Sequence, residues 1–138
     1  MAAKSEIVAV LQERTGAFLA LLRALTGESD RPSIAHALAW SVRRLGGSTA
    51  SLLEATEDEV AEIASGDALI DVAELRLLES MRGNLIAVTN RTGPVQDDYN
   101  DLSRRLEKAI TEKRAAILGD HGIDLQATAA QTARIRAL

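Results

Sequence analysis

DVAELRLLESMRGNLIAV at residues 71–88 and VQDDYNDLSRRLEKAITEKRAAI at residues 95–117 are the two segments that decide the fold. The first segment is apolar around most of its circumference, which is typical of a buried helix. The second carries one narrow apolar stripe, formed by Tyr99, Leu102, Leu106, Ile110 and Ile117. Between them, the sequence Thr89 to Pro94 predicts a break, because Gly93-Pro94 stops helices. The two segments therefore predict a helical hairpin.

Two amphipathic helices are predicted ahead of this hairpin. Apolar residues recur at intervals close to 3.6 over residues 5–25 and again over residues 31–45, which indicates one buried face on each helix. The second helix is expected to begin near Arg31, where Ser29, Asp30 and Pro32 supply start signals. Gly46-Gly47 is expected to end it.

The remaining helix boundaries are set by capping residues. Residues 48–65 predict one or two short helices, because Thr56 and Glu59 have the spacing of a capping box. Asp67 is the expected N-cap of the central helix, and Gly119 and Gly122 are expected to break the last one. The chain is thus predicted to be all-α, a bundle of four to five helices with a central helical hairpin.

Length and composition describe one helical domain followed by a tail. The chain has 138 residues, 46% of them hydrophobic and only 2% aromatic, so its core must consist mainly of aliphatic side chains. Residues 1–122 are predicted to form the domain, whereas residues 123–138 lack the apolar density for a core and are expected to order on a partner. The N-terminal sequence reaches Glu13 and Arg14 too early for a signal peptide, and no apolar run approaches a membrane span.

The sequence predicts neither a metal site, a cofactor nor an enzyme. It has no cysteine, and neither His36 nor His121 has a glutamate at the spacing that places two ligands on one helix face. Gly46-Gly47-Ser48 resembles a phosphate-binding turn, but a helix stop followed by a helix start explains all three residues. The acidic pairs Asp58-Glu59 and Asp97-Asp98 each fall in the first turn of a predicted helix, where negative charge is stabilising.

Trp40 is a candidate for a subunit interface, together with Arg43 and Arg44. On a helical wheel Trp40 lies away from the apolar stripe of its own helix, and tryptophan and arginine often dominate interface energies. Arg44, one turn on, is placed to stack on the indole. The alternative, held equally, is that another helix of the same domain covers Trp40.

Nucleic acid is not favoured as a tight partner. The net charge is −4, and Arg43-Arg44 and Arg104-Arg105 are short basic pairs typical of solvated helix faces. A helix-turn-helix, in which residues 31–45 are followed by a second helix over Ser48 to Ala55, remains a weaker alternative. The acidic residues that follow it would repel DNA.

The order of the parts resembles a known family. The residues concerned are Ala73-Glu74-Leu75-Arg76-Leu77-Leu78-Glu79, Asn84, Val88, Gly93-Pro94, Leu102 and Arg105-Leu106-Glu107. This arrangement is similar to that of the all-helical head-tail connector, or adaptor, proteins of tailed bacteriophages, which bind beneath the portal. The pair Asn100-Asp101 departs from the pattern, which has Ser-Gln before the leucine.

The resemblance implies a structural virion protein in the phage neck, assembled in the host cytoplasm. Its expected partners are the portal protein, a tail-side connector or stopper protein, and further copies of itself in a ring, commonly a dodecamer. DNA is expected only in transit through the lumen, and no membrane is expected as a partner. The tail is expected to bind the portal through Ile123, Leu125, Arg134, Ile135, Arg136 and Leu138.

A second hypothesis comes from a different class of function. The alternative is a free cytoplasmic helical domain that binds one protein partner or acts as a regulator. A ring subunit needs two different surfaces that meet, whereas a small regulator is most often a two-fold dimer. Assembly state therefore discriminates between the two hypotheses.

Overall fold

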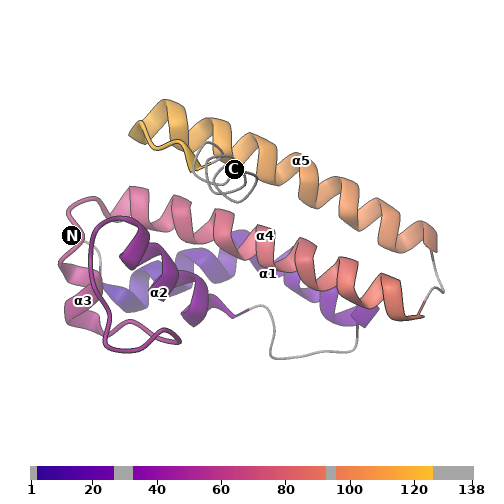
Figure 1. The fold of residues 1–138 in the computed structure, drawn as a ribbon, viewed down its shortest axis with the longest axis horizontal. Helices are drawn as coiled ribbons and strands as arrows, with labels where there is room; N and C mark the ends of the chain where they lie inside the picture. Colours follow the sequence, from indigo (N-terminus) through magenta and orange to yellow (C-terminus); the bar gives the residue numbers. More distant parts are fainter. Residues whose placement is uncertain (1–2, 27–32, 93–95, 126–138) are drawn as a thin grey trace, which may run out of the picture.

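The fold is all-α, as predicted. The structure, a computed structural model, describes residues 3–26, 33–92 and 96–125, and these residues contain helices and no strand. The helices are α1 (Lys4–Thr26), α2 (Ile34–Arg44), α3 (Glu57–Ala61), α4 (Gly66–Thr92) and α5 (Gln96–His121). Figure 1 shows α4 and α5 as the two long arms of the predicted hairpin.

The central helix α4 organises the packing. It contacts α5 along the hairpin, and it also packs against α1 and α2. In Figure 1, α5 lies above α4, while α1 runs behind it and α2 lies below it at the end of the molecule where α3 is found. Because α4 is surrounded by neighbours, it needs apolar residues on most of its circumference, which is the pattern of its sequence.

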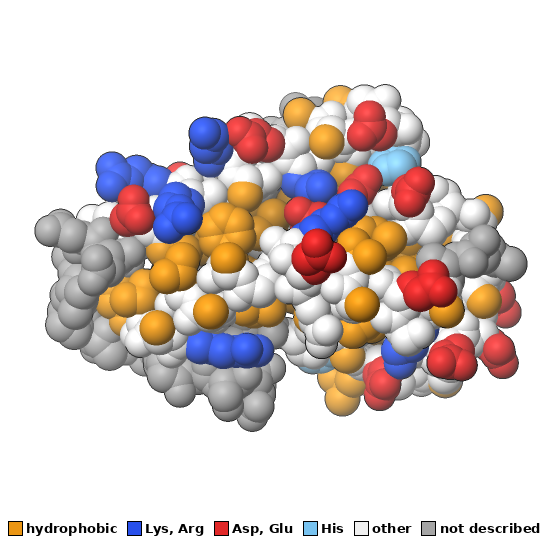
Figure 2. Space-filling view, turned by 180° about the vertical axis from the view of Figure 1, so that it is seen from behind, with side chains coloured by type: hydrophobic (Ala, Val, Ile, Leu, Met, Phe, Trp, Pro, Cys, Tyr) orange, Lys and Arg blue, Asp and Glu red, His pale blue; other side chains and the backbone are white. Residues whose placement is uncertain are grey.

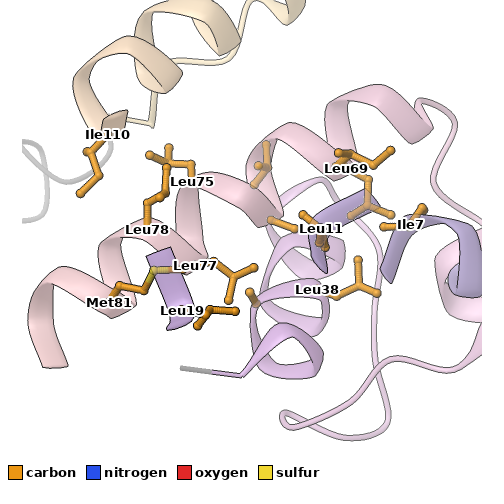
Figure 3. Close-up of a cluster of buried hydrophobic side chains, with 14 of the residues drawn as sticks. Ile7, Leu11, Leu19, Leu38, Leu69, Leu75, Leu77, Leu78, Met81 and Ile110 are labelled. Carbon is orange, nitrogen blue, oxygen red and sulfur yellow. The ribbon is translucent and has the colours of Figure 1, made fainter. Parts of the chain in front are cut away.

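The core consists of aliphatic side chains, as the low aromatic content predicts. Figure 3 shows leucines of α4 meeting residues of α1, α2 and α5. The largest fully buried side chains are Ile7, Leu11, Leu22, Leu38, Val42, Leu69, Leu75, Leu77, Met81, Leu85, Leu106 and Ile117. Each large side chain buried in this way stabilises the fold by about 1.5–3 kcal/mol relative to exposure.

The boundaries of α4 differ from the prediction at both ends. The helix begins at Gly66, and the Ser65 Oγ accepts a hydrogen bond from the Ala68 N–H at 3.1 Å, so the predicted cap at Asp67 is wrong. Asp67 lies instead in the first turn, where its charge suits the helix dipole. At the other end the helix continues through Thr89 to Thr92. Threonine and asparagine lower helix propensity only slightly, so the helix can include them.

The start of α2 and the end of α5 also differ from the prediction. Helix α2 begins at Ile34 with Ser33 as its N-cap, three residues after the predicted start at Arg31, which lies outside the described residues. Helix α5 continues through Gly119 to His121, contrary to the predicted break. Of Gly119 and Gly122, Gly122 is the one with a positive φ, +69°, a left-handed conformation that glycine adopts at little energetic cost at the end of a helix.

Residues 45–56 form a loop that is fixed at both ends. At its start, the Gly47 N–H donates to the Val42 carbonyl at 2.9 Å, and a Cβ at this position would lie 2.8 Å from the Val42 Cγ1. At its end, the predicted capping box of α3 is confirmed: Thr56 Oγ1 accepts from the Glu59 N–H, and Glu59 Oε1 accepts from the Thr56 N–H. The loop contains no helix, so the second helix of the helix-turn-helix alternative is not formed.

Candidate functional site

The first polar feature is a cluster of charged groups between α1, α4 and α5. Asp71 Oδ1 lies 3.1 Å from Arg14 Nη1 and 3.4 Å from Lys113 Nζ, and Asp71 Oδ2 lies 2.8 Å from His121 Nε2. Glu74 Oε1 shares the same two cations, at 3.1 Å from Arg14 and 3.2 Å from Lys113. A polar hollow of about 420 Å³ opens beside this cluster. We call these five residues the Asp71 cluster.

The electrostatics of the Asp71 cluster favour the ionised carboxylate. Partial burial by itself would raise the pKa of Asp71. The hydrogen bond with His121, the charge of Lys113 and the hydrogen bonds with Lys113 and Arg14 outweigh this effect, so the pKa is lowered. A carboxylate that is held by three cationic or hydrogen-bonding groups is a poor proton acceptor. The cluster therefore ties α1 and α5 to α4 and is not suited to acid-base chemistry.

The second feature is a pocket between α2, α4 and the 45–56 loop. It measures about 180 Å³ and is lined by His36, Ala37, Trp40, Arg43, Leu52, Arg76 and Ser80. We call it the Trp40 pocket. Helix α2 presents His36, Trp40 and Arg43 on one side of it, because these positions are three or four residues apart. Helix α4 supplies Arg76 and Ser80, which are also one turn apart.

The charges of the Trp40 pocket are arranged differently from those of the Asp71 cluster. The Arg76 guanidinium lies over the indole of Trp40, 4.7 Å from the ring centroid, which is a favourable cation–π distance. The Arg43 Nη1 donates to Thr49 Oγ1 at 2.9 Å. Among the described residues, neither arginine forms an ion pair with a carboxylate. The pocket thus combines two cations that have no carboxylate partner among the described residues with the indole of Trp40 and the apolar side chains of Ala37 and Leu52.

The structure brings together two of the three residues that the sequence suggested for a subunit interface. Trp40 and Arg43 both line the pocket, while Arg44 is half-buried at the end of α2 and does not line it. The guanidinium over the indole belongs to Arg76, not to Arg44 as expected from the helical spacing. Trp40 itself is half-buried and packs against the core, so its own domain covers one side and leaves the other open.

The predicted tail lies largely outside the described residues. Ile123 and Leu125, its first two apolar residues, are half-buried and pack against the core of their own domain. Arg134, Ile135, Arg136 and Leu138 are not among the described residues. The part of the chain that packs on the domain therefore extends past the predicted boundary at residue 122, at least to Leu125.

The Asp71 cluster was missed by sequence reasoning, which treated His121 as isolated. The signal was present, because Asp67, Asp71 and Glu74 are three or four residues apart and so lie on one side of the otherwise apolar first half of α4. Carboxylates on a helix that is otherwise surrounded by core must have cationic partners. Which cations reach them depends on the three-dimensional packing.

No group of residues in the described part of the chain has the composition and geometry of a metal site. None of the described helices combines the length and apolarity needed to cross a membrane. Comparisons of the chain with protein-family models, with curated proteins and with solved structures found no match. Function is therefore inferred from the fold and from the two polar features.

Proposed function

We propose that the chain is a head-tail connector subunit of a tailed bacteriophage. In this proposal it is a non-enzymatic structural protein that assembles into a ring, commonly a dodecamer, between the portal and a tail-side connector or stopper protein. DNA passes through the lumen of the ring. The observation that carries the proposal is the α4–α5 hairpin, which contains the residues of the family resemblance.

Two charged residues of the resemblance, Glu79 and Glu107, form ion pairs across the hairpin, which we call clasps. Glu79 Oε2 lies 2.6 Å from Arg114 Nη2, and Glu107 Oε1 lies 2.8 Å from Arg82 Nη2. One clasp joins a carboxylate of α4 to a cation of α5, and the other joins a cation of α4 to a carboxylate of α5. Paired in this way, the two clasps favour one register of the hairpin.

The apolar residues of the resemblance belong to the core of the domain. On α4 they include Leu75, Leu77 and Leu78, and on α5 they include Leu102 and Leu106, all of which are buried. Helices packed over such an extended apolar seam form a rigid unit. A rigid helical body is what a subunit needs if it must keep its position in a ring while a polymer moves past it.

The charge of the chain suits a wall along which DNA travels. Its net charge is −4, so a ring of copies is strongly acidic. A lumen of like charge repels the phosphate backbone and does not retain it, whereas tight DNA binding requires clustered Lys and Arg. This supports a conduit more than it supports a DNA-binding regulator.

Mass measurements test the proposal. Light scattering on the purified chain, alone and mixed with the portal protein encoded nearby, should show a large ring complex with the portal. A chain lacking residues 126–138 should lose portal binding, because Arg134, Ile135, Arg136 and Leu138 are the proposed portal contacts. This truncation keeps Ile123 and Leu125, which pack on the core, so the helical domain remains intact.

Point variants make the same test without shortening the chain. Ile135→Asp should weaken portal binding, and Gln131→Ala, in the same segment, serves as the matched control that should not. A stable two-fold dimer with no affinity for the portal would contradict the connector proposal. It would favour the alternative, a free cytoplasmic helical domain that binds one protein partner.

A further inference from the structure

The Trp40 pocket has the properties of a receptor for a carboxylate that is flanked by apolar groups. Arg43 and Arg76 converge on it without an acidic partner among the described residues, in a chain whose net charge is negative. Leu52 stands at its rim with 70% of its surface exposed, and Leu53 beside it is 62% exposed. Arginine and tryptophan are enriched at protein interfaces, and the two exposed leucines add apolar surface beside them.

Helix α1 presents a surface of complementary chemistry. Its outward face carries the exposed residues Glu6, Ala9, Glu13, Ala17, Ala20 and Ala24, which are three or four positions apart. A helix face in water is normally dense in charged side chains, but this one has two carboxylates, Glu6 and Glu13, among four alanines, and Glu13 lies at its middle. Glu13 forms no ion pair with any described residue. The short neighbouring side chains would allow another surface to reach its carboxylate.

The two surfaces lie on different sides of the molecule. The pocket is formed by α2, α4 and the 45–56 loop, and no residue of α1 lines it. Figure 2, seen from behind relative to Figure 1, looks onto the side on which α1 runs, with hydrophobic side chains spread over its middle. Two different surfaces that attract each other give a heterologous contact, which is the kind that builds a ring.

We propose that the Trp40 pocket of one copy binds the Glu13 face of α1 from a neighbouring copy. The Glu13 carboxylate pairs with Arg43 and Arg76, while the alanines of α1 pack against Trp40 and Leu52. This inference rests on the proposed ring assembly and assigns the two surfaces that meet in it. A phosphate backbone is a poorer occupant, because it offers no apolar group to Trp40 and Leu52 and is repelled by the acidic chain.

Charge reversal and its rescue test the pairing. Arg76→Glu and Glu13→Arg should each raise the apparent dissociation constant of ring assembly by about tenfold or more, since each places like charges opposite one another. The chain that carries both substitutions should assemble again, because the reversed charges attract. Rescue would show that the single variants are folded and that the two residues face each other. Arg104→Glu, at an exposed position of α5, is the matched control, and the chain that carries it should assemble normally.

Trp40 provides a direct readout, since it is the only tryptophan in the chain. Its emission should shift to shorter wavelength as the wild-type chain assembles, while the Glu13→Arg variant, whose own pocket is unchanged, should show no shift. A ring that forms equally well from all variants would overturn this inference and leave the connector proposal standing. A wild-type chain that forms no ring, with or without the portal, would overturn both. If added duplex DNA prevents assembly but the charge-reversal substitutions do not, the pocket binds phosphate, and this inference is overturned.

Discussion

Arg14 and Arg76 occupy contrasting environments in one small domain. Arg14 shares two carboxylates with Lys113, and each charge in the Asp71 cluster has an opposite partner within the fold. Arg76 lies over an indole and has no carboxylate partner among the described residues. The contrast separates two uses of charge: paired groups that hold helices together, and unpaired groups at an open pocket that are available to another molecule.

The largest loss of stability should come from removing the central carboxylate of the Asp71 cluster. Asp71→Ala leaves Arg14, Lys113 and His121 without their shared acceptor, and we expect it to lower the free energy of unfolding by about 1–3 kcal/mol. Arg76→Ala removes a partly exposed cation–π contact and should lower it by about 0.5–1 kcal/mol. Urea unfolding followed by circular dichroism measures both. If the two variants lost equal free energy of unfolding, the Asp71 cluster and the Trp40 pocket would not differ in their contribution to stability.

The pH dependence of stability sharpens the same comparison. The pKa of Asp71 is lower in the folded chain than its ordinary value of 3.8, so its ionised form stabilises the fold. That contribution is complete above the ordinary pKa and is lost as the pH falls through the lower, folded value. Unfolding free energy measured from pH about 6 down to about 2 should therefore fall more steeply for wild type than for Asp71→Asn. Parallel curves for the two proteins would show that Asp71 does not contribute to the pH dependence of stability.

A smaller loss of stability is expected from breaking one of the two ion pairs across the hairpin. Glu79→Gln removes the charge that faces Arg114, and because both side chains are about 30% exposed, solvent screening limits the loss. We expect a loss of about 0.5–1 kcal/mol. A double-mutant cycle with Arg114→Ala isolates the pair from other effects of each substitution. A coupling energy near zero would mean that the leucine seam alone fixes the hairpin.

The smallest effect on stability is expected at the rim of the pocket. Leu52→Ser changes a side chain that is 70% exposed, so the free energy of unfolding should change by less than about 0.5 kcal/mol. Ring assembly, in contrast, should weaken measurably, because the rim leucine loses its apolar contact. Thermal unfolding and light scattering on the same sample give the two readings. A marked drop in melting temperature would instead assign Leu52 a role within the fold.

Local sequence signals predicted most of the helices. The apolar spacing along α1, α2 and α5 and the Thr56–Glu59 capping box act over one or two helical turns, so they are visible in the sequence. Boundaries were less predictable, because competing signals lie close together. Ser65 and Asp67 are both good caps, and Gly119 alone is too weak a helix breaker to end α5 while its neighbours remain packed.

The polar features were less predictable because their partners are distant in the chain. Trp40 was recognised as unusual from its position on the helix, but Arg76 reaches it from α4, 36 positions later. His121 reaches Asp71 across 50 positions. In each case the sequence identifies one residue that needs a partner, and the packing of the helices determines which residue becomes that partner.

The 45–56 loop has a consequence for how this protein can change over evolutionary time. It is anchored by Gly47 at one end and by the Thr56–Glu59 box at the other, and the Ala50 N–H is also held by Glu59 Oε2 at 2.7 Å. Leu52 and Leu53 are displayed between these anchors and contribute little to the core. Substitutions at Leu52 and Leu53 should therefore alter the exposed surface of the loop while the helical scaffold stays folded.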